Sequence, residues 1–159
     1  MATWLLIVTP TGEITQVGKR LQKNTTGYAL EKLICGSEGT LGIITKLCLK
    51  LRPIAPYHFD MVAIFTDETK ALAVPNQLLM AGVQPTAIEF LDNKGIQSEE
   101  RFMNMTLPHS KDNGNYIIIT IDSYDQDDLD NRVATADEIC EKNGSVETLV
   151  ADDRIWGAR

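Results

Sequence analysis

The sequence predicts an α+β fold whose C-terminal part is a ferredoxin-like unit. Apolar runs with strand and helix periods follow one another there in the order β-α-β-β-α-β, typical of a four-stranded antiparallel sheet with two helices on one face. Pro53 and Pro56 mark an extended connector before this unit. The net charge is +4 up to Pro56 and −11 after it. We therefore expect two domains, residues 1–55 and 56–159.

The N-terminal region is rich in β-type segments. Two strand-like runs flank Pro10-Thr11-Gly12, which supplies the turn chemistry of a hairpin. A short helical segment and a third strand that ends before Pro53 follow. The expected elements are strands at Trp4–Thr9, Ile14–Val17 and Ile43–Leu51 and a helix at Leu30–Ile34.

The C-terminal region has longer and more regular elements. Asp67 is placed to cap the first helix, and Asn143-Gly144 ends the second helix as a C-cap does. A helical insertion separates the second strand from the third. The expected elements are strands at Phe59–Phe65, Thr86–Leu91, Tyr116–Asp122 and Ser145–Val150, helices at Asp67–Ala81 and Gln126–Lys142, and the insertion at Asp92–Met105.

Composition narrows the class of protein. The chain has 43% hydrophobic and 23% charged residues, as ordinary globular domains do. Its net charge of −7 argues against a nucleic-acid partner, whose phosphates attract Lys and Arg. The longest apolar runs fall far short of the roughly 20 residues that a transmembrane helix needs. We expect a cytoplasmic protein with no transmembrane segment.

Residues that often bind metals form no recognisable metal site here. The cysteines Cys35, Cys48 and Cys140 lie far apart, without the paired spacing of a zinc site, and we expect them to be buried thiols. The aspartates between 122 and 130 lack the glycine and the terminal glutamate of a calcium loop. They fit a solvated helix start, where negative charge is favourable. These acids are Asp122, Asp125, Asp127, Asp128 and Asp130.

The stretch Gly36-Ser37-Glu38-Gly39-Thr40-Leu41-Gly42 is the most informative part of the chain. Glycine lacks a Cβ and tolerates positive φ, so the backbone here can pass close to a bulky ligand and direct N–H groups at it. The loop matches neither the nucleotide-triphosphatase nor the dinucleotide-binding pattern. From composition and spacing alone, it is a ligand-binding loop or a structural turn.

The identity of the surrounding residues favours ligand binding. Lys23-Asn24-Thr25-Thr26-Gly27-Tyr28-Ala29-Leu30, followed by Leu33-Ile34-Cys35 and then Gly36 to Thr45, closely resembles the FAD-linked oxidase family. This group includes D-lactate dehydrogenase, the glycolate oxidase flavoprotein subunit and D-2-hydroxyglutarate dehydrogenase. The resemblance implies a vanillyl-alcohol-oxidase-like FAD-binding domain, of which residues 1–55 would be the C-terminal part. Residues 56–159 would then be the ferredoxin-like part of the substrate, or cap, domain.

The resemblance also implies which residues line FAD. The family usually has Asp where this chain has Ala29, and an Asp there would cap the short helix that follows. The implied FAD-contacting residues all lie in or just after the glycine loop. They are Gly36, Ser37, Glu38, Gly39, Thr40, Gly42, Ile43 and Ile44.

The resemblance continues through Pro85–Asp92, where Glu89 alternates with apolar neighbours and is expected to face solvent. It ends at Trp156-Gly157-Ala158-Arg159, which is similar to a family motif whose arginine holds the substrate carboxylate through a bidentate contact. The family's histidine segment, implied to carry the general base, has no counterpart here. His58 and His109 are both expected at the surface, and no catalytic residue is assigned.

The expected function is therefore that of a fragment of a FAD-dependent 2-hydroxy-acid oxidoreductase. In the whole enzyme, the resemblance implies hydride transfer from the substrate Cα to flavin N5 and an unidentified electron acceptor. The fragment would need the remainder of the polypeptide or a partner subunit, and we expect it to be inactive alone. The alternative is a non-catalytic binding or assembly module, because the ferredoxin-like fold hosts many functions.

Overall fold

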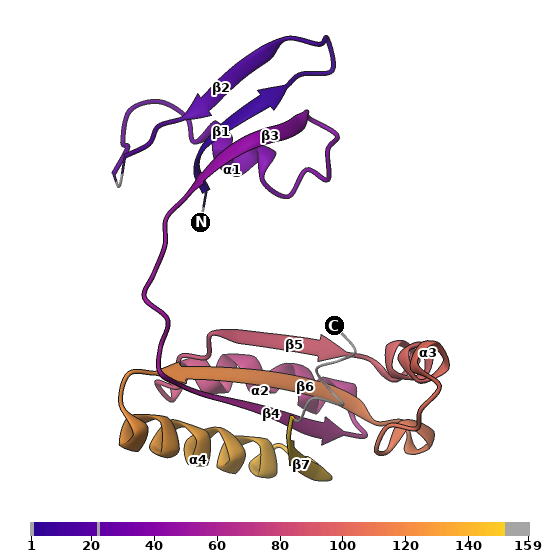
Figure 1. Cartoon of the computed structure of the whole chain (residues 1–159). Helices are drawn as coiled ribbons and strands as arrows, with labels where there is room; N and C mark the ends of the chain where they lie inside the picture. Colours follow the sequence, from indigo (N-terminus) through magenta and orange to yellow (C-terminus); the bar gives the residue numbers. More distant parts are fainter. Residues whose placement is uncertain (1, 22, 152–159) are drawn as a thin grey trace. The chain divides into compact units, whose positions relative to one another are not determined.

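The computed structural model describes residues 2–21 and 23–151, which form two compact units (Figure 1). The N-terminal unit extends to Ile54 and the C-terminal unit begins at Ala55. None of the described helices is long and apolar enough to cross a bilayer.

The N-terminal unit is a three-stranded antiparallel sheet with one short helix. The sheet order is β2-β1-β3, so the predicted hairpin supplies the central strand and one edge strand. Leu5, Ile7 and Val17 of the sheet pack with Ile34 of the helix to form its small core. The elements are β1 (Ala2–Val8), β2 (Ile14–Gly18), α1 (Leu30–Ile34) and β3 (Ile43–Leu49).

The C-terminal unit has the predicted β-α-β-β-α-β order with the expected helical insertion. Its antiparallel sheet has the order β5-β6-β4-β7, in which the first and third strands of the unit lie in the centre. The fold class predicted from the sequence is confirmed. The elements are β4 (Tyr57–Phe65), α2 (Glu68–Met80), β5 (Ala87–Leu91), α3 (Asn93–Met103), the 3-10 turn η1 (Ser110–Asp112), β6 (Asn115–Ser123), α4 (Gln126–Lys142) and β7 (Glu147–Val150).

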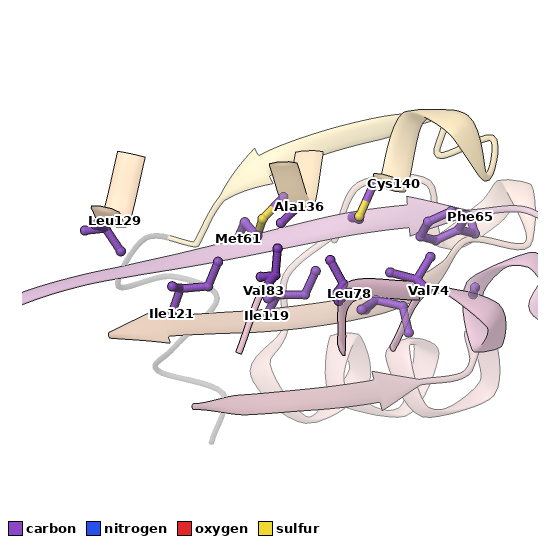
Figure 2. Close-up of a cluster of buried hydrophobic side chains, with 13 residues drawn as sticks. Met61, Phe65, Val74, Leu78, Val83, Ile119, Ile121, Leu129, Ala136 and Cys140 are labelled. Atoms are coloured by element: carbon purple, nitrogen blue, oxygen red, sulfur yellow. The ribbon is translucent and has the colours of Figure 1, made fainter. Parts of the chain in front are cut away.

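The main core lies between this sheet and helices α2 and α4 (Figure 2). Alternate strand residues point to one face, so every second residue of β4 and β6 meets the helices. Both helices therefore cover the same face, as the sequence predicted. The fully buried members from the sheet are Ala63, Phe65, Ile117, Ile119 and Ile121, and those from the helices are Ala71, Val74, Leu78, Ala136 and Cys140.

The insertion α3 covers part of the opposite face of the sheet. Its buried Ile96 packs with Leu107 of the following loop against residues of the two central strands. Both faces of β4 and β6 are therefore apolar at this end, which explains the continuous burial from Met61 to Phe65. The strand residues in this second core are Val62, Ile64, Tyr116 and Ile118.

The cysteines differ in exposure, which corrects one expectation. Cys140 is buried, Cys48 is half-buried and Cys35 is exposed. Cys35 was expected to be buried because apolar residues precede it, but it follows the last residue of α1, and only Ile34 of this pair points into the small core. Burial, and secondarily the charge of Asp137, raise the pKa of the Cys140 thiol to about 12. It is therefore a neutral packing residue at physiological pH.

Candidate functional site

The glycine loop lies between the end of α1 and the start of β3. The short helix ends at Ile34, and the amide of Cys35 still donates to the Glu31 carbonyl at 3.0 Å. The Ser37 amide then donates to the Ile34 carbonyl at 3.1 Å, which turns the chain away from the helix axis. The predicted loop is thus anchored at one end by α1 and at the other by the sheet.

Four residues of the loop have positive φ: Gly36 at 91°, Glu38 at 51°, Gly39 at 82° and Gly42 at 151°. The Thr40 amide donates to the Ser37 carbonyl at 2.9 Å, so residues 37–40 form a β-turn with positive φ at both central positions, as in a type I′ turn. Glu38 occupies the left-handed region, where residues other than glycine are uncommon. The backbone here is held in a conformation that the glycines make accessible.

The turn leaves backbone donors available. Thr40 closes it twice, because its hydroxyl also donates to the Ser37 carbonyl at 2.6 Å. Within the described part of the chain, the amides of Glu38 and Gly39 donate no hydrogen bond. Successive free N–H groups in such a turn form a concave donor set that suits phosphate or carbonyl oxygens. The loop therefore has the donor chemistry that a nucleotide cofactor needs.

The glycines of the loop serve two different purposes. A Cβ on Gly42 would lie 2.9 Å from the Val8 carbonyl oxygen, so this glycine is required by packing against β1. A Cβ on Gly36 or Gly39 would meet nothing within 4 Å. Gly39 is exposed at the tip of the turn. The space beside Gly36 and Gly39 is open to a group from outside the unit, which is what the fit of a flat cofactor requires.

The two isoleucines after the loop lie on different faces of β3. Ile44 is opposite Ile7 and shares the face of the small core, whereas Ile43 is opposite Val8 on the other face. Ile43 is 66% exposed and Ile44 is 38% exposed. Only one of them can pack beside a ligand on a given face of this sheet.

The remaining predicted residues do not join this loop. Arg159 lies outside the described residues. Glu89 is exposed on edge strand β5, and His58 is exposed on β4, as expected. His109 is half-buried. Its Nε2 lies 3.2 Å from a Glu147 carboxylate oxygen, within hydrogen-bonding distance, and its Nδ1 lies 3.6 Å from a carboxylate oxygen of Asp112. These contacts give the ring a structural role.

The aspartates around the start of α4 have structural partners. Asp125 caps the helix by accepting from the Asp128 amide at 2.9 Å. Asp128 accepts from the Ser123 hydroxyl at 2.7 Å and from Arg132 at 3.1 Å. Hydrogen bonds from Ser123 and then Arg132 lower the pKa of Asp128. Among residues 2–21 and 23–151, no three potential ligands come together to hold a metal ion.

A second concave feature was not predicted. A pocket of about 350 Å³ lies between α4 and the β4–β7 side of the sheet, with Asp130 and Asp137 in an otherwise largely apolar lining. The sequence signal was the recurrence of Asp130, Val133, Ala134 and Asp137 at intervals of three and four residues, which places them on one helix face.

Comparison with known families matches residues 60–159 to the family described as FAD linked oxidases, C-terminal domain. The chain is 32% identical over 152 residues to D-lactate dehydrogenase of Anaerostipes hadrus, covering 93% of this chain and 32% of that protein. It is 33% identical over 106 residues to glycolate oxidase subunit GlcD of Bacillus subtilis, covering 67% of this chain and 23% of that protein. The chain thus spans about a third or less of the length of these relatives.

Solved structures support the same fold. P-cresol methylhydroxylase with substrate bound aligns with a TM-score of 0.66 at 17% identity, over 94% of this chain and 34% of that chain. Alkyldihydroxyacetonephosphate synthase aligns with a TM-score of 0.59 at 23% identity, over 99% of this chain and 30% of that chain. At these identities the likeness concerns the fold alone.

Proposed function

Because this chain belongs to the FAD-linked oxidases, through the C-terminal domain of that family, we propose that it is part of a flavoenzyme that oxidises a small 2-hydroxy acid with FAD. Relatives named D-lactate dehydrogenase and glycolate oxidase subunit support this substrate class. The observation that carries the proposal is the glycine loop, where Gly39 has positive φ and open space beside it. The cytoplasmic location expected from the sequence stays a prediction.

The proposal assigns residues 1–55 to the C-terminal part of a FAD-binding domain and residues 56–159 to the cap domain. The N-terminal unit supports its part of this assignment by leaving many large apolar side chains uncovered. Twelve of them are exposed by more than a third in its described residues, which is characteristic of a piece of a larger domain. Examples are Leu33, Leu47, Leu51 and Ile54.

Within the proposed site, the residues from Gly36 to Gly42 place backbone groups against FAD. The amides of Glu38 and Gly39 supply donors, and Ile43 or Ile44 supplies an apolar contact. When bound, the flavin supplies the redox chemistry by accepting hydride from the substrate Cα. Arg159 is proposed to hold the substrate carboxylate with its planar guanidinium. None of the described residues is assigned as the base that takes the hydroxyl proton.

One test is activity. We expect the purified 159-residue chain to show no 2-hydroxy-acid oxidation, because none of its described residues is assigned as the base and it covers only 32% of the length of the D-lactate dehydrogenase of Anaerostipes hadrus. The assay uses D-lactate, glycolate and D-2-hydroxyglutarate with added FAD and an artificial electron acceptor. Turnover that co-purifies with the chain through two different columns would reject the expected inactivity.

The decisive test concerns the flavin loop in a polypeptide that joins this chain to a complete FAD-binding half. Gly39→Val is expected to abolish FAD retention, because a β-branched side chain at positive φ strains the turn and fills the open space. Gly12→Val is the matched control: Gly12 also has positive φ, at 87°, and open space, but it lies in the β1–β2 hairpin. The readout is the ratio of flavin to protein absorbance. If Gly39→Val keeps as high a ratio of flavin to protein absorbance as Gly12→Val, the loop is only a structural turn.

A further inference from the structure

Two Asn-Gly dipeptides lie in the C-terminal unit, Asn113-Gly114 and Asn143-Gly144. An asparagine in this context can lose its side-chain amide, because the backbone nitrogen of the next residue can attack the side-chain carbonyl carbon. Glycine permits this attack most readily, since it has no Cβ to obstruct the approach and its backbone adopts a wide range of conformations. Whether a given dipeptide reacts in the folded protein depends on how the surrounding structure holds it.

The Asn113-Gly114 peptide is held in place by the packing around it. The Gly114 amide donates to the His109 carbonyl at 2.9 Å, and the Asn113 carbonyl accepts from the Asn115 side-chain amide at 3.1 Å. Gly114 is buried, and a Cβ on it would lie 2.7 Å from the His109 carbonyl oxygen. Rotation of this peptide toward the asparagine side chain would break both hydrogen bonds in a place with no spare room. We therefore expect the fold to suppress deamidation here.

The Asn143-Gly144 peptide has more room. Gly144 is exposed just after α4 and has φ at 81°. Among the described residues that are not its chain neighbours, only Lys70 has atoms within 4 Å of a Cβ placed on Gly144, and the nearer of them, Nζ, lies at 3.6 Å on a flexible side chain. The Gly144 amide donates to the Glu141 carbonyl at 2.8 Å, in the last turn of a helix, where ends fray. The backbone of this site can therefore rotate into the geometry of attack.

The Asn143 side chain restrains this second site. Its nitrogen donates to the Gln77 side-chain oxygen and to the Ile139 carbonyl, both at 2.8 Å, and its oxygen accepts from the Gln77 side-chain nitrogen at 2.9 Å. Gln77 lies on α2, so this reciprocal amide pair links α2 to the end of α4. The carbonyl carbon of Asn143 must turn toward the Gly144 nitrogen before attack, and that movement breaks the pair at a cost in free energy.

We propose that Asn143-Gly144 is a site of spontaneous deamidation whose rate is limited by the pairing of Asn143 with Gln77. The Gly144 nitrogen gives its proton to hydroxide and forms a bond to Asn143 Cγ, the bond from Cγ to the side-chain nitrogen breaks, and ammonia leaves with a proton from water. Water then opens the resulting succinimide ring to aspartate or isoaspartate, so no oxidant or reductant is needed. The product places a negative charge at the C-terminal end of α4, which the helix dipole disfavours, and removes the donor to Gln77 and Ile139. Deamidation therefore weakens the link between α2 and α4. This inference is independent of the proposed flavin loop.

The test follows both sites in the full 159-residue chain. After incubation in mildly alkaline buffer, peptide mapping by mass spectrometry measures deamidation at Asn113 and at Asn143 separately. We expect Asn143 to react about tenfold faster than Asn113 in the folded chain, because more contacts must break at Asn113 in a more closely packed place. In urea, where neither site is folded, the two rates should be similar. A faster reaction at Asn113 in the folded chain would overturn the choice of site.

Two adjacent amide side chains on α2 test the restraint by Gln77. Gln77→Ala removes the pair and is expected to raise the deamidation rate at Asn143 about tenfold, with the rate at Asn113 unchanged. Asn76→Ala removes the neighbouring exposed amide, which contacts the Met80 sulfur at 3.9 Å, and is expected to change the Asn143 rate less than about twofold. Asn113 also reports on unfolding, because loss of the whole fold would accelerate both sites. Equal acceleration of both sites, an unchanged rate at Asn143 in Gln77→Ala, or equal effects of the two variants would overturn the proposal.

Discussion

Asn115 is buried at the start of β6 and connects three segments through one side chain. Its amide nitrogen donates to the Phe65 carbonyl at 3.2 Å and to the Asn113 carbonyl at 3.1 Å, and its oxygen accepts from the Asn93 amide at 3.2 Å. Asn93 in turn donates to the carbonyls of Ser110 and Gly114. These bonds hold the α3 insertion and the following loop against the end of β4.

Asn115→Ala is expected to lower the free energy of unfolding of the C-terminal unit by about 2–3 kcal/mol, because it removes a buried hydrogen bond to the Phe65 carbonyl and two partly buried ones, to the Asn113 carbonyl and from the Asn93 amide. Urea unfolding followed by circular dichroism measures the change. Asn76→Ala is the control, since Asn76 is exposed on α2 and its described contact is a weak one to the Met80 sulfur at 3.9 Å. A loss no larger than that of the control would show that the network is dispensable.

Asp128 gives a prediction about pH. Hydrogen bonds from Ser123 and Arg132 lower its pKa from the ordinary value of 3.8 in the folded state. Its contribution to stability is therefore complete well above pH 3.8 and is lost as the pH falls through the lowered folded pKa. In Asp128→Asn, unfolding free energies measured from pH 6 down to pH 2.5 should fall less steeply below about pH 4. The same slope in both proteins would contradict the assignment.

At the scale of elements, the helices of the C-terminal unit begin where a side chain satisfies their first amides. Asp67 accepts from the amides of Thr69 and Lys70, and Asp92 accepts from that of Gly95. Asp125 does the same for α4. The helix α1 has Ala29 at this position and no side-chain cap. This difference follows from local sequence alone and makes α1 dependent on the packing of Ile34.

Asp125→Ala is expected to destabilise the C-terminal unit by about 1 kcal/mol, through loss of the hydrogen bond to the Asp128 amide. Asp127→Ala removes a charge from the same helical turn without removing the cap, and is expected to cost only a few tenths of a kcal/mol. Thermal unfolding of both variants at low ionic strength provides the comparison. Equal losses would mean that charge, and not the cap, determines the effect.

At the scale of the whole molecule, the two units differ in how much core they have. The C-terminal unit has two hydrophobic clusters, one on each face of its sheet, and the first has thirteen buried residues among those that the structure describes. The N-terminal unit has a single cluster of four buried residues and leaves twelve large apolar side chains exposed. A piece of this size buries too little apolar surface to be strongly stable on its own.

The rate of amide hydrogen exchange should therefore differ between the two units. We expect amides of β1 and β3 to exchange more than about a hundredfold faster than those of β4 and β6, because local opening of the small unit costs less free energy. Exchange followed by mass spectrometry on the 159-residue chain measures both units in one sample. Comparable protection of the two sheets would show that the N-terminal unit is held by contacts beyond its own core.

The sequence by itself determined the order and type of the elements. Their periodicity, the Asp67 and Asn143-Gly144 signals and the chirality of β-α-β crossovers together specified the ferredoxin-like unit with both helices on one face. It also located the glycine loop, since neighbouring residues there act together through local backbone conformation. The strand ends predicted from the sequence differ from those of the structure by only a few residues. They differ because the end of a strand depends on where its pairing with the partner strand stops.

Only the tertiary structure decided what distant residues do together. It divided the loop glycines into one packed against Val8 and others beside open space, which depends on how β1 approaches the loop. It showed Cys35 to be exposed, because the face on which a residue lies depends on where α1 docks. It also brought Met61, Asp137 and Val150 into one groove. Such groupings arise from packing between segments far apart in the chain, a property that local sequence patterns do not encode.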